Sequence, residues 1–344
     1  MIGAGTLPAG SWIANARFAP VLDHAPKSDL LHADGRVAAV RIDRELSSDT
    51  LADGSFELDS FSLQGVAPGQ VGGWWMEGVW DYVRHLVAML EADVPILGAS
   101  MPKGLPRGAI GIGEHPVFVA EGATVEPSVC FDTTAGPILL SAGSRVMAFT
   151  RLVGPLYVGP HSILTTDRIS ASSIGDTCKV HGELSTTIMT GHSNKGHDGF
   201  VGHSMMGRWV NLGAGTITSN LKNTYGPVQL WTPGGLRDSG MQFLGTFFGD
   251  HAKAGIGTRL TTGCVLGAGA NVFGAEMMPK VVAPFAWGET DNFETYRIDK
   301  FLESVERMMA RREQFLREGM RTQLERAHAQ RWSAEPYLRN SVLR

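Results

Sequence analysis

Aliphatic or aromatic residues recur every six positions over long stretches of the chain, and this period constrains the fold more than any other feature. The clearest runs are Leu140, Val146, Leu152, Val158 and Leu164, and later Phe248, Ala254, Leu260, Leu266 and Val272. An α-helix, with a period of about 3.6 residues, and an alternating strand cannot produce this spacing. A triangular solenoid can, because each six-residue unit forms one flat side whose apolar residue points inward.

Small residues follow many of these apolar positions, as in Val158-Gly159 and Leu266-Gly267, and they allow the chain to turn a corner. Glycine accounts for 43 of 344 residues, without the three-residue period of collagen, and 43% of residues are hydrophobic, which excludes a disordered chain. The sequence therefore predicts a mainly β protein with a parallel β-helix of hexapeptide repeats over about residues 108–288. A β-sandwich with regular glycine turns is the weaker interpretation.

Three stretches depart from the six-residue phase. Residues 165–173 need only a small adjustment, whereas residues 185–199 are rich in His, Asn, Lys and Thr. Residues 221–242 contain a Thr-Pro-Gly-Gly sequence between apolar runs and resemble a protruding hairpin. Because loops that leave a rigid scaffold often carry function, we expect the functional site near these breaks.

The segments on either side of the repeats predict helices. Apolar residues of 76–93 fall on one helical face, and a second amphipathic helix is expected within about 295–330, packed on the end or side of the solenoid. We therefore expect three parts: a small α/β segment (1–100), the β-helix (101–288) and a C-terminal helical tail (289–344).

The charge and cysteine content exclude several classes of protein. A net charge of −4 without a basic cluster argues against binding to nucleic acid or to an anionic membrane. The three cysteines are far apart, which predicts neither a disulfide framework nor a zinc knuckle. Since no signal peptide and no long apolar run are evident, we expect a cytoplasmic protein.

Two motifs fourteen residues apart carry a family resemblance. They are Lys195-Gly196-His197 and the segment from Asn211 to Asn220, which reads Asn-Leu-Gly-Ala-Gly-Thr-Ile-Thr-Ser-Asn. Both resemble the acetyltransferase half of the bifunctional glucosamine-1-phosphate acetyltransferase / N-acetylglucosamine-1-phosphate uridylyltransferase family, and particularly a divergent bacterial branch of sugar nucleotidyltransferases. The resemblance covers about residues 100–330. It implies a left-handed β-helix and a homotrimer with active sites between adjacent chains.

The resemblance assigns roles to individual residues. His197 falls on the catalytic base of the family, and Asn220 on the asparagine near the acetyl group. Glu183 and Asn211 fall on substrate-contacting positions. Arg168 falls near an arginine that binds the substrate phosphate, if one residue is deleted from the alignment.

This chain departs from the family pattern at three substrate positions, where Ser185 replaces a lysine and Phe200 and Leu221 replace tyrosines. We therefore expect Lys195 or Lys222 to supply the missing positive charge to substrate. The coenzyme A contacts of the family fall around Ile256 and Gly274. We regard the other histidines of this region, His181, His192 and His203, as structural.

The implied activity is transfer of an acetyl group from acetyl-CoA to the amine of an amino-sugar phosphate, such as glucosamine-1-phosphate, in the synthesis of cell-envelope precursors. A histidine suits removal of the amine proton, and an asparagine amide suits stabilisation of the oxyanion. This chemistry needs no metal. The first hundred residues resemble only the tail of a nucleotidyltransferase domain, so we expect no uridylyltransferase activity.

Two other functions remain open. A metalloenzyme like the γ-carbonic anhydrases would use three histidine ligands on the same solenoid. If coils contain 18 residues, however, Lys179 precedes His197 and Ser185 precedes His203, so the sequence predicts no zinc site. The other alternative is a non-catalytic solenoid that binds a sugar nucleotide or stabilises an assembly.

Overall fold

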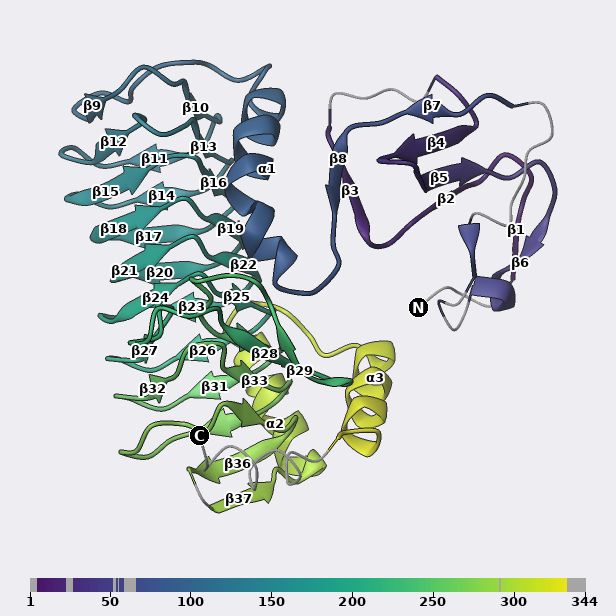
Figure 1. Ribbon diagram of the computed structural model, residues 1–344. Coiled ribbons are helices and arrows are strands. Elements are labelled where there is room, and N and C mark those ends of the chain that lie inside the picture. Colours follow the sequence, from purple (N-terminus) through teal and green to yellow (C-terminus); the bar gives the residue numbers. More distant parts are fainter. Residues whose placement is uncertain are drawn as a thin grey trace. The chain divides into compact units, whose positions relative to one another are not determined.

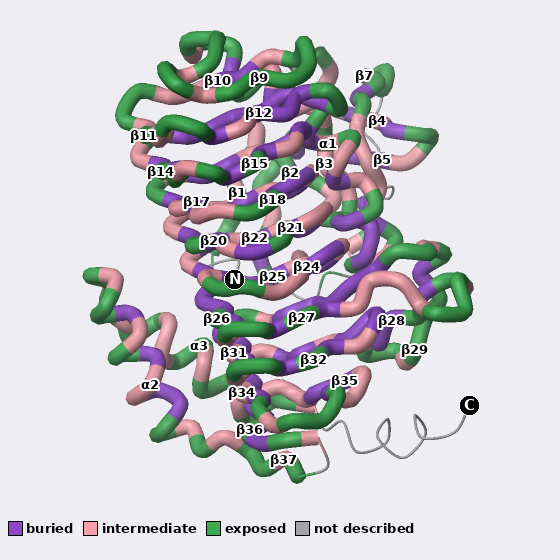
Figure 2. The backbone as a smooth tube through the Cα atoms, turned by 90° about the vertical axis from the view of Figure 1, so that its left-hand side faces the viewer, coloured by how far each residue is buried: buried purple, intermediate pink, exposed green. Residues whose placement is uncertain are grey.

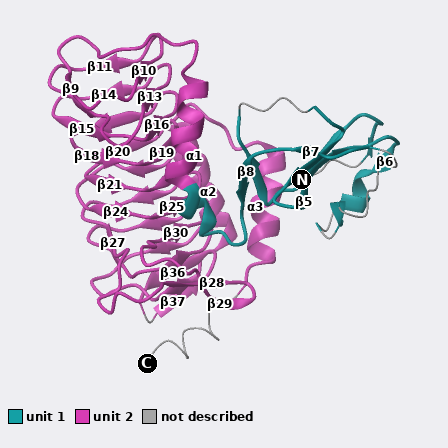
Figure 3. Cartoon of the chain, turned by 45° about the horizontal axis from the view of Figure 1, so that its top comes forward, with its two compact units in different colours: residues 1–85 teal, residues 86–344 magenta. Residues whose placement is uncertain are grey.

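A computed structural model of the chain describes residues 5–22, 27–51, 54, 56–58, 66–290 and 292–332. The chain divides into two compact units, Met1–His85 and Leu86–Arg344 (Figure 3). Helix α1 (Asp81–Leu97) begins in the first unit and continues into the second.

The described residues of the first unit ahead of α1 form short strands and one 3₁₀ turn. Antiparallel pairing joins β2 to β5 and β5 to β4, around a small core that includes Val40 and Ile42. The elements are β1 (Thr6–Leu7), β2 (Trp12–Ala14), β3 (Phe18–Pro20), β4 (Leu30–Ala33), β5 (Arg36–Arg41), β6 (Leu46–Ser47), η1 (Ser48–Leu51), β7 (Gly69–Gln70) and β8 (Gly73–Trp75).

The second unit is a parallel β-solenoid whose strands stack into three faces (Figure 1). Within the described residues, face 1 consists of β10 (Val117–Val119), β13 (Ile138–Leu140), β16 (Leu156–Val158), β19 (Ser173–Asp176), β22 (Ile188–Gly191), β25 (Met205–Met206), β30 (Phe247–Phe248), β33 (Val265–Leu266) and β35 (Val281–Val282).

Faces 2 and 3 complete each coil in the order face 1, face 2, face 3. Face 2 consists of β11 (Thr124–Val125), β14 (Arg145–Val146), β17 (Ile163–Thr165), β20 (Lys179–His181), β23 (Asn194–Lys195), β26 (Asn211–Leu212), β31 (Lys253–Ala254), β34 (Asn271–Val272), β36 (Ala286–Glu289) and the antiparallel β37 (Asn292–Thr295). Face 3 consists of β9 (Ile110–Ile112), β12 (Cys130–Asp132), β15 (Thr150–Val153), β18 (Asp167–Ser170), β21 (Glu183–Ser185), β24 (Phe200–Gly202), β27 (Ile217–Thr218) and β32 (Arg259–Leu260). The prediction of a hexapeptide-repeat parallel β-helix is confirmed.

The apolar residues of the repeat fill the interior of the solenoid. In face 2, Leu164 pairs in register with Val180, and both side chains are fully buried. Burial of one such side chain stabilises the fold by about 1.5–3 kcal/mol, so these inward columns, rather than the very short strands, hold the coils together. One position breaks the column, because Lys195 lies in register between Val180 and Leu212.

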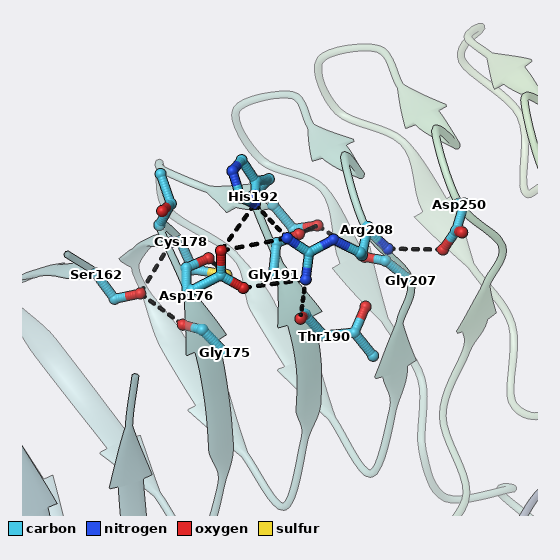
Figure 4. A network of polar contacts seen from close by, with 12 residues as sticks. Ser162, Gly175, Asp176, Cys178, Thr190, Gly191, His192, Gly207, Arg208 and Asp250 are labelled. Atoms are coloured by element: carbon cyan, nitrogen blue, oxygen red, sulfur yellow. Dashed lines mark hydrogen bonds and ion pairs between the residues drawn. The ribbon is translucent and has the colours of Figure 1, made fainter. Parts of the chain in front are cut away.

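Buried hydroxyl groups link successive coils at the corner between faces 1 and 2, here called edge 1–2. The Ser162 hydroxyl donates to the Gly175 carbonyl (2.6 Å) and accepts from the Cys178 N–H (2.9 Å) (Figure 4). Ser193 repeats the same pattern two coils later. Because a buried polar group is costly without a partner, each serine fixes the spacing of two coils.

The first two breaks in the repeat stay inside the solenoid. Ile174 and its partner Met189 are 15 residues apart, whereas Leu140 and Val158 are 18 apart. Residues 185–199 therefore form a shortened coil with strands β22 and β23, not the protruding loop that we expected. The third break is the predicted hairpin, formed by β28 (Gln229–Thr232) and β29 (Gly235–Asp238).

The C-terminal tail forms two helices instead of the single helix expected within 295–330. Helix α2 (Ile298–Ala310) and helix α3 (Glu318–Ala329) are separated by a turn in which Glu313 has a φ of 55°. The Arg312 guanidinium in this turn donates to the Thr177 carbonyl (3.1 Å) and to Asn194 Oδ1 (2.8 Å). These contacts tie the break to the solenoid, and no periodicity in the sequence reports them.

The helices and the hairpin cover two regions of the solenoid. Helix α1 packs on the early strands of face 1 through Leu90 and Phe118, and Trp231 of the hairpin packs on the late strands through Val281. Helix α2 packs on edge 1–2 through Phe301. In Figure 2, the strands of face 3 lie towards the viewer with no described helix in front of them.

Candidate active site

His197 lies on the turn between β23 and β24, at the corner between faces 2 and 3, here called edge 2–3. Its imidazole is exposed and makes no hydrogen bond within the described residues. Gly199 has a φ of 121°, and a Cβ there would lie 2.2 Å from the Thr216 carbonyl oxygen. The Asp198 carbonyl accepts a hydrogen bond from the Gly215 N–H (3.1 Å). The turn therefore presents a free imidazole while its backbone is held against the next coil.

Lys195 was predicted to reach substrate, but its side chain points into the solenoid and is only 1% exposed. The ammonium donates to the His181 carbonyl (3.0 Å) and to the His197 carbonyl. Burial lowers the pKa of Lys195 to about 8, against the opposing attraction of Asp198 and Asp167. Both observed partners are backbone groups of edge 2–3, which leaves this ammonium no direct route to a ligand on the surface.

Three side chains on edge 2–3 form what we call the carboxylate–histidine cluster: Asp167, His181 and Asp198. The His181 Nε2 atom lies 2.9 Å from Asp198 Oδ1 and 3.5 Å from Asp167 Oδ2. The three side chains offer ligand atoms within 4.8 Å of one another, which makes this the one candidate metal group in the described residues. It holds one histidine and two carboxylates, not the three histidines of the carbonic-anhydrase alternative, and the Lys195 ammonium already interacts with both carboxylates.

The expectation of 18-residue coils is wrong at this point of the chain. Glu183 pairs with Phe200, seventeen residues later. This register sets His181 and Gly182, rather than Lys179, against the turn of His197. The shortened coil therefore explains why His181 belongs to the candidate site although we interpreted it as structural.

Asn220 lies at the corner between faces 3 and 1, here called edge 3–1. Its Nδ2 atom lies 2.8 Å from His203 Nδ1, and the His203 ring stacks on Phe243 at 5.3 Å between centroids. With the Asn220 amide as donor, Nδ1 accepts and the proton of His203 resides on Nε2. Burial lowers the pKa of His203, which favours this neutral form. The second N–H of the Asn220 amide remains available for a ligand.

Phe200 and Asn220 meet above Gly202. A Cβ at Gly202 would lie 2.3 Å from the Phe200 ring and 2.9 Å from Asn220 Nδ2. The insertion that carries the hairpin leaves and returns at this corner, since the Leu244 N–H donates to the Asn220 carbonyl (2.9 Å). The backbone of Asn220 is thus anchored by the insertion, and its side chain is anchored by His203.

The outer surface of face 3, between the two edges, holds Arg168 and Glu183. Their side chains form an ion pair of 3.4 Å and are each about half exposed. Such exposed pairs contribute only about 0–1 kcal/mol, so Arg168 can exchange its carboxylate partner for another anion at little cost. These two predicted substrate residues are neighbours of Phe200 on one surface.

Asn211 and Lys222 lie away from this surface. Asn211 is on face 2, where its side-chain oxygen accepts from Asn194 Nδ2 (3.2 Å). Lys222 is in the insertion, and its ammonium donates to the Pro227 carbonyl (2.6 Å). In a single chain, neither residue joins His197 or Asn220.

The two residues predicted to contact coenzyme A share edge 2–3 with His197. Ile256 lies two coils beyond His197 and is 79% exposed, and Gly274 lies three coils beyond it. Since parallel strands are spaced by about 4.8 Å, these positions are about 10 and 14 Å from the turn of His197 along the edge. An extended ligand lying along this edge would pass all three.

His197 and Asn220 lie at opposite edges of face 3. Residues 198–202 span the face between the two corners, a distance of roughly 16 Å in extended backbone. One substrate carbonyl cannot contact both side chains of the same chain. The family motif is therefore complete in sequence but divided in space.

A separate polar network stabilises edge 1–2, beneath the C-terminal helices (Figure 4). Arg208 donates to both Asp176 carboxylate oxygens (3.0 and 3.2 Å), and its Nη2 lies 2.6 Å from His192 Nδ1. Burial raises the pKa of Asp176, but the hydrogen bonds and charge of Arg208 outweigh it and lower the pKa overall. This network supports the prediction that His192 is structural.

Sequence comparison agrees with the resemblance. No known family profile matches the chain. It is 32% identical over 117 residues to the bifunctional sugar-1-phosphate nucleotidylyltransferase/acetyltransferase of Sulfurisphaera tokodaii, which covers 34% of this chain and 27% of the relative. It is 27% identical over 226 residues to the bifunctional protein GlmU of Methanococcus vannielii, which covers 65% and 50%. The chain thus spans half or less of these relatives.

Solved structures with distant likeness are acyltransferases. They include a UDP-N-acetylglucosamine acyltransferase, with 14% identity, a TM-score of 0.23 and coverage of 55% of this chain and 72% of the other. They also include a mutant of AntD, an N-acyltransferase from Bacillus cereus in complex with dTDP-4-amino-4,6-dideoxyglucose and coenzyme A, with 14% identity, a TM-score of 0.25 and coverage of 59% and 92%. Among the described residues, no helix is both long and apolar enough to cross a membrane. This chain is therefore similar, over its solenoid, to the bifunctional sugar-1-phosphate nucleotidylyltransferase/acetyltransferases.

Proposed function

We propose that the chain is an N-acetyltransferase that moves an acetyl group from acetyl-CoA to the amine of an amino-sugar phosphate resembling glucosamine-1-phosphate. One observation carries the proposal: His197 and Asn220 border the only face of the solenoid that is free of helices in the described residues, and that face carries Arg168 and Glu183. The sequence similarity to acetyltransferases supports it independently.

The chemistry requires a base, an oxyanion donor and correct positioning of two substrates. The amine nitrogen attacks the thioester carbonyl carbon while the His197 imidazole accepts the amine proton, a contribution of about 10²–10⁴-fold. The free N–H of Asn220 donates to the developing oxyanion, at about 3 kcal/mol. The carbon–sulfur bond then breaks, and coenzyme A leaves with a proton as the free thiol.

We further propose that the site forms between copies of the chain. His197 on edge 2–3 of one copy would face Asn220 on edge 3–1 of its neighbour, as in a cyclic trimer built from one repeated, heterologous contact. Acetyl-CoA would lie along edge 2–3, past Ile256 and Gly274. The pantetheine arm compares in length with about five extended residues, or about 17 Å, which is sufficient for this path.

The phosphate of the amino sugar would bind Arg168. The guanidinium would leave Glu183, and the released carboxylate would accept hydrogen bonds from sugar hydroxyls. Phe200 would supply an apolar surface for the sugar ring. Asn211 and Lys222 would contribute only if a neighbouring copy brings face 2 or the insertion close to the site.

Release of free thiol from acetyl-CoA in the presence of glucosamine-1-phosphate tests the proposal. His197→Asn should reduce the rate by about 10²-fold or more, because asparagine cannot accept the proton. The matched control is His161→Asn, which replaces another exposed histidine on edge 1–2 and should leave the rate unchanged.

Loss of the effect would redirect the interpretation. An unaltered protein that releases no thiol, but binds a sugar nucleotide, would favour the non-catalytic alternative. Thiol release that is equal in His197→Asn and in the unaltered protein would refute the role of His197 while leaving the reaction class in place.

A further inference from the structure

We propose that Lys195 is a positioning residue whose buried ammonium ties the turn of His197 to the preceding coil. This proposal rests on the proposed function for the catalytic role of His197. The tie itself is a claim about the fold and can be tested without activity.

Lys195 occupies a position that the repeat reserves for apolar residues. Its register neighbours in the inward column are Val180 and Leu212, which are 0% and 2% exposed. A buried lysine loses side-chain entropy and the hydration of its charge, so it destabilises a core unless it gains strong partners. A methionine or leucine would fill the same space without this cost.

The partners of Lys195 join two successive turns of edge 2–3. The ammonium donates to the His181 carbonyl of the preceding turn (3.0 Å) and to the carbonyl of His197 itself. Gly182 leaves the space for this contact, because a Cβ there would lie 2.8 Å from Lys195 Nζ and 3.0 Å from the His197 carbonyl oxygen. The ammonium therefore acts as an internal bracket between the two turns.

A second link on the outside of the edge joins the same two turns. Asp198 follows His197, and its Oδ1 atom lies 2.9 Å from His181 Nε2. The side chain of Asp198 is 88% exposed, so this outer link is screened by water, whereas the inner link through Lys195 is not. The inner link is accordingly the one that determines how firmly the turn is held.

Loss of the ammonium should loosen the turn more than the solenoid. In Lys195→Met the apolar side chain fits the inward column, while the His181 and His197 carbonyls lose their donor. Displacement of a catalytic group by about 1 Å costs on the order of 10²-fold in rate. We therefore expect kcat to fall about 10- to 100-fold with KM changed less than about twofold, since His197 acts on the transition state rather than on binding.

The matched control is Leu212→Met, which makes the same kind of substitution one coil further along the same column. Hydrogen exchange of the peptide covering residues 196–202 should be faster in Lys195→Met than in the unaltered protein, and unchanged in Leu212→Met. Equal exchange in the two variants would overturn the tie. Unchanged kcat in a folded, active Lys195→Met protein would overturn its role in positioning His197.

Amine labelling of the unaltered protein provides a test that needs no variant. Lys195 should resist reductive methylation under conditions that modify the exposed Lys103 and Lys300. Labelling of Lys195 at the same rate as these two lysines would overturn the proposal, even if Lys195→Met fails to fold. If the unaltered protein has no acetyltransferase activity, faster exchange in Lys195→Met still supports the tie, and only the proposed function fails.

Discussion

Acidification should weaken the contact between helix α2 and the solenoid, because His251 is buried in a place that disfavours its charged form. The side chain is 6% exposed, and its Nδ1 atom has no hydrogen-bond partner within the described residues. Its ring lies 5.8 Å from that of Phe301 of α2 and 6.5 Å from that of Trp209. Burial lowers the pKa of His251 to about 3, and the nearby ammonium of Lys253 adds to the effect.

The size and sign of the effect follow from the two pKa values. An unfolded histidine has a pKa of about 6.5. Between this value and about 3, the unfolded chain binds a proton that the folded chain does not, so stability falls as the pH falls. Relative to pH 7, the loss from His251 alone is about 2 kcal/mol at pH 5, and it approaches about 5 kcal/mol below pH 3.

Urea unfolding at pH 7 and pH 5, for the unaltered protein and for His251→Phe, isolates this contribution. Phenylalanine keeps an aromatic ring against Trp209 and Phe301 but does not titrate. Other groups of this region, including His192 and Asp176, remain in both proteins and cancel in the difference. We expect the free energy of unfolding of His251→Phe to depend less on pH, by about 2 kcal/mol over this range. An identical pH dependence in the two proteins would refute the reasoning.

Three further predictions concern the candidate site. His203→Ala removes the partner of the Asn220 amide and should lower kcat about tenfold while the protein remains folded; an unchanged kcat would separate this histidine from the reaction. Gly199→Ala places a methyl group against the Thr216 carbonyl and should lower the melting temperature by several degrees, whereas an unchanged value would contradict the tight corner. Metal analysis of the purified protein should find no stoichiometric zinc, and chelation should not alter thiol release. Stoichiometric zinc in the carboxylate–histidine cluster would instead favour a metalloenzyme.

The six-residue period was sufficient to predict the solenoid, since only inward-pointing columns produce it. The hairpin at 229–238 was also predictable, because a Thr-Pro-Gly-Gly sequence interrupts the repeat. The break between α2 and α3 was not. The apolar pattern continues to Phe315, yet this residue is 80% exposed, and the chain turns where Arg312 reaches two residues of the solenoid. Contacts between distant segments leave no local pattern.

The candidate site was predictable in its motifs but not in its contacts. His197 and Asn220 were identified from the spacing of two motifs, and their separation across face 3 follows only from the winding of the chain. The links of Lys195 to His181 and of Asn220 to His203 depend on coils that are shorter than 18 residues. Coil length varies with small corner adjustments, so a fixed spacing pairs the wrong residues.

Mixed assemblies of two variants test most directly whether His197 and Asn220 act together between copies of the chain. His197→Asn and Asn220→Ala chains, carrying different affinity tags, can be coexpressed and purified through both tags. In a cyclic trimer of either mixed composition, one of the three interfaces joins an intact His197 to an intact Asn220. We predict that mixed trimers release thiol at about one third of the unaltered rate, far above either parent variant. Mixed trimers as inactive as both parents would contradict the account.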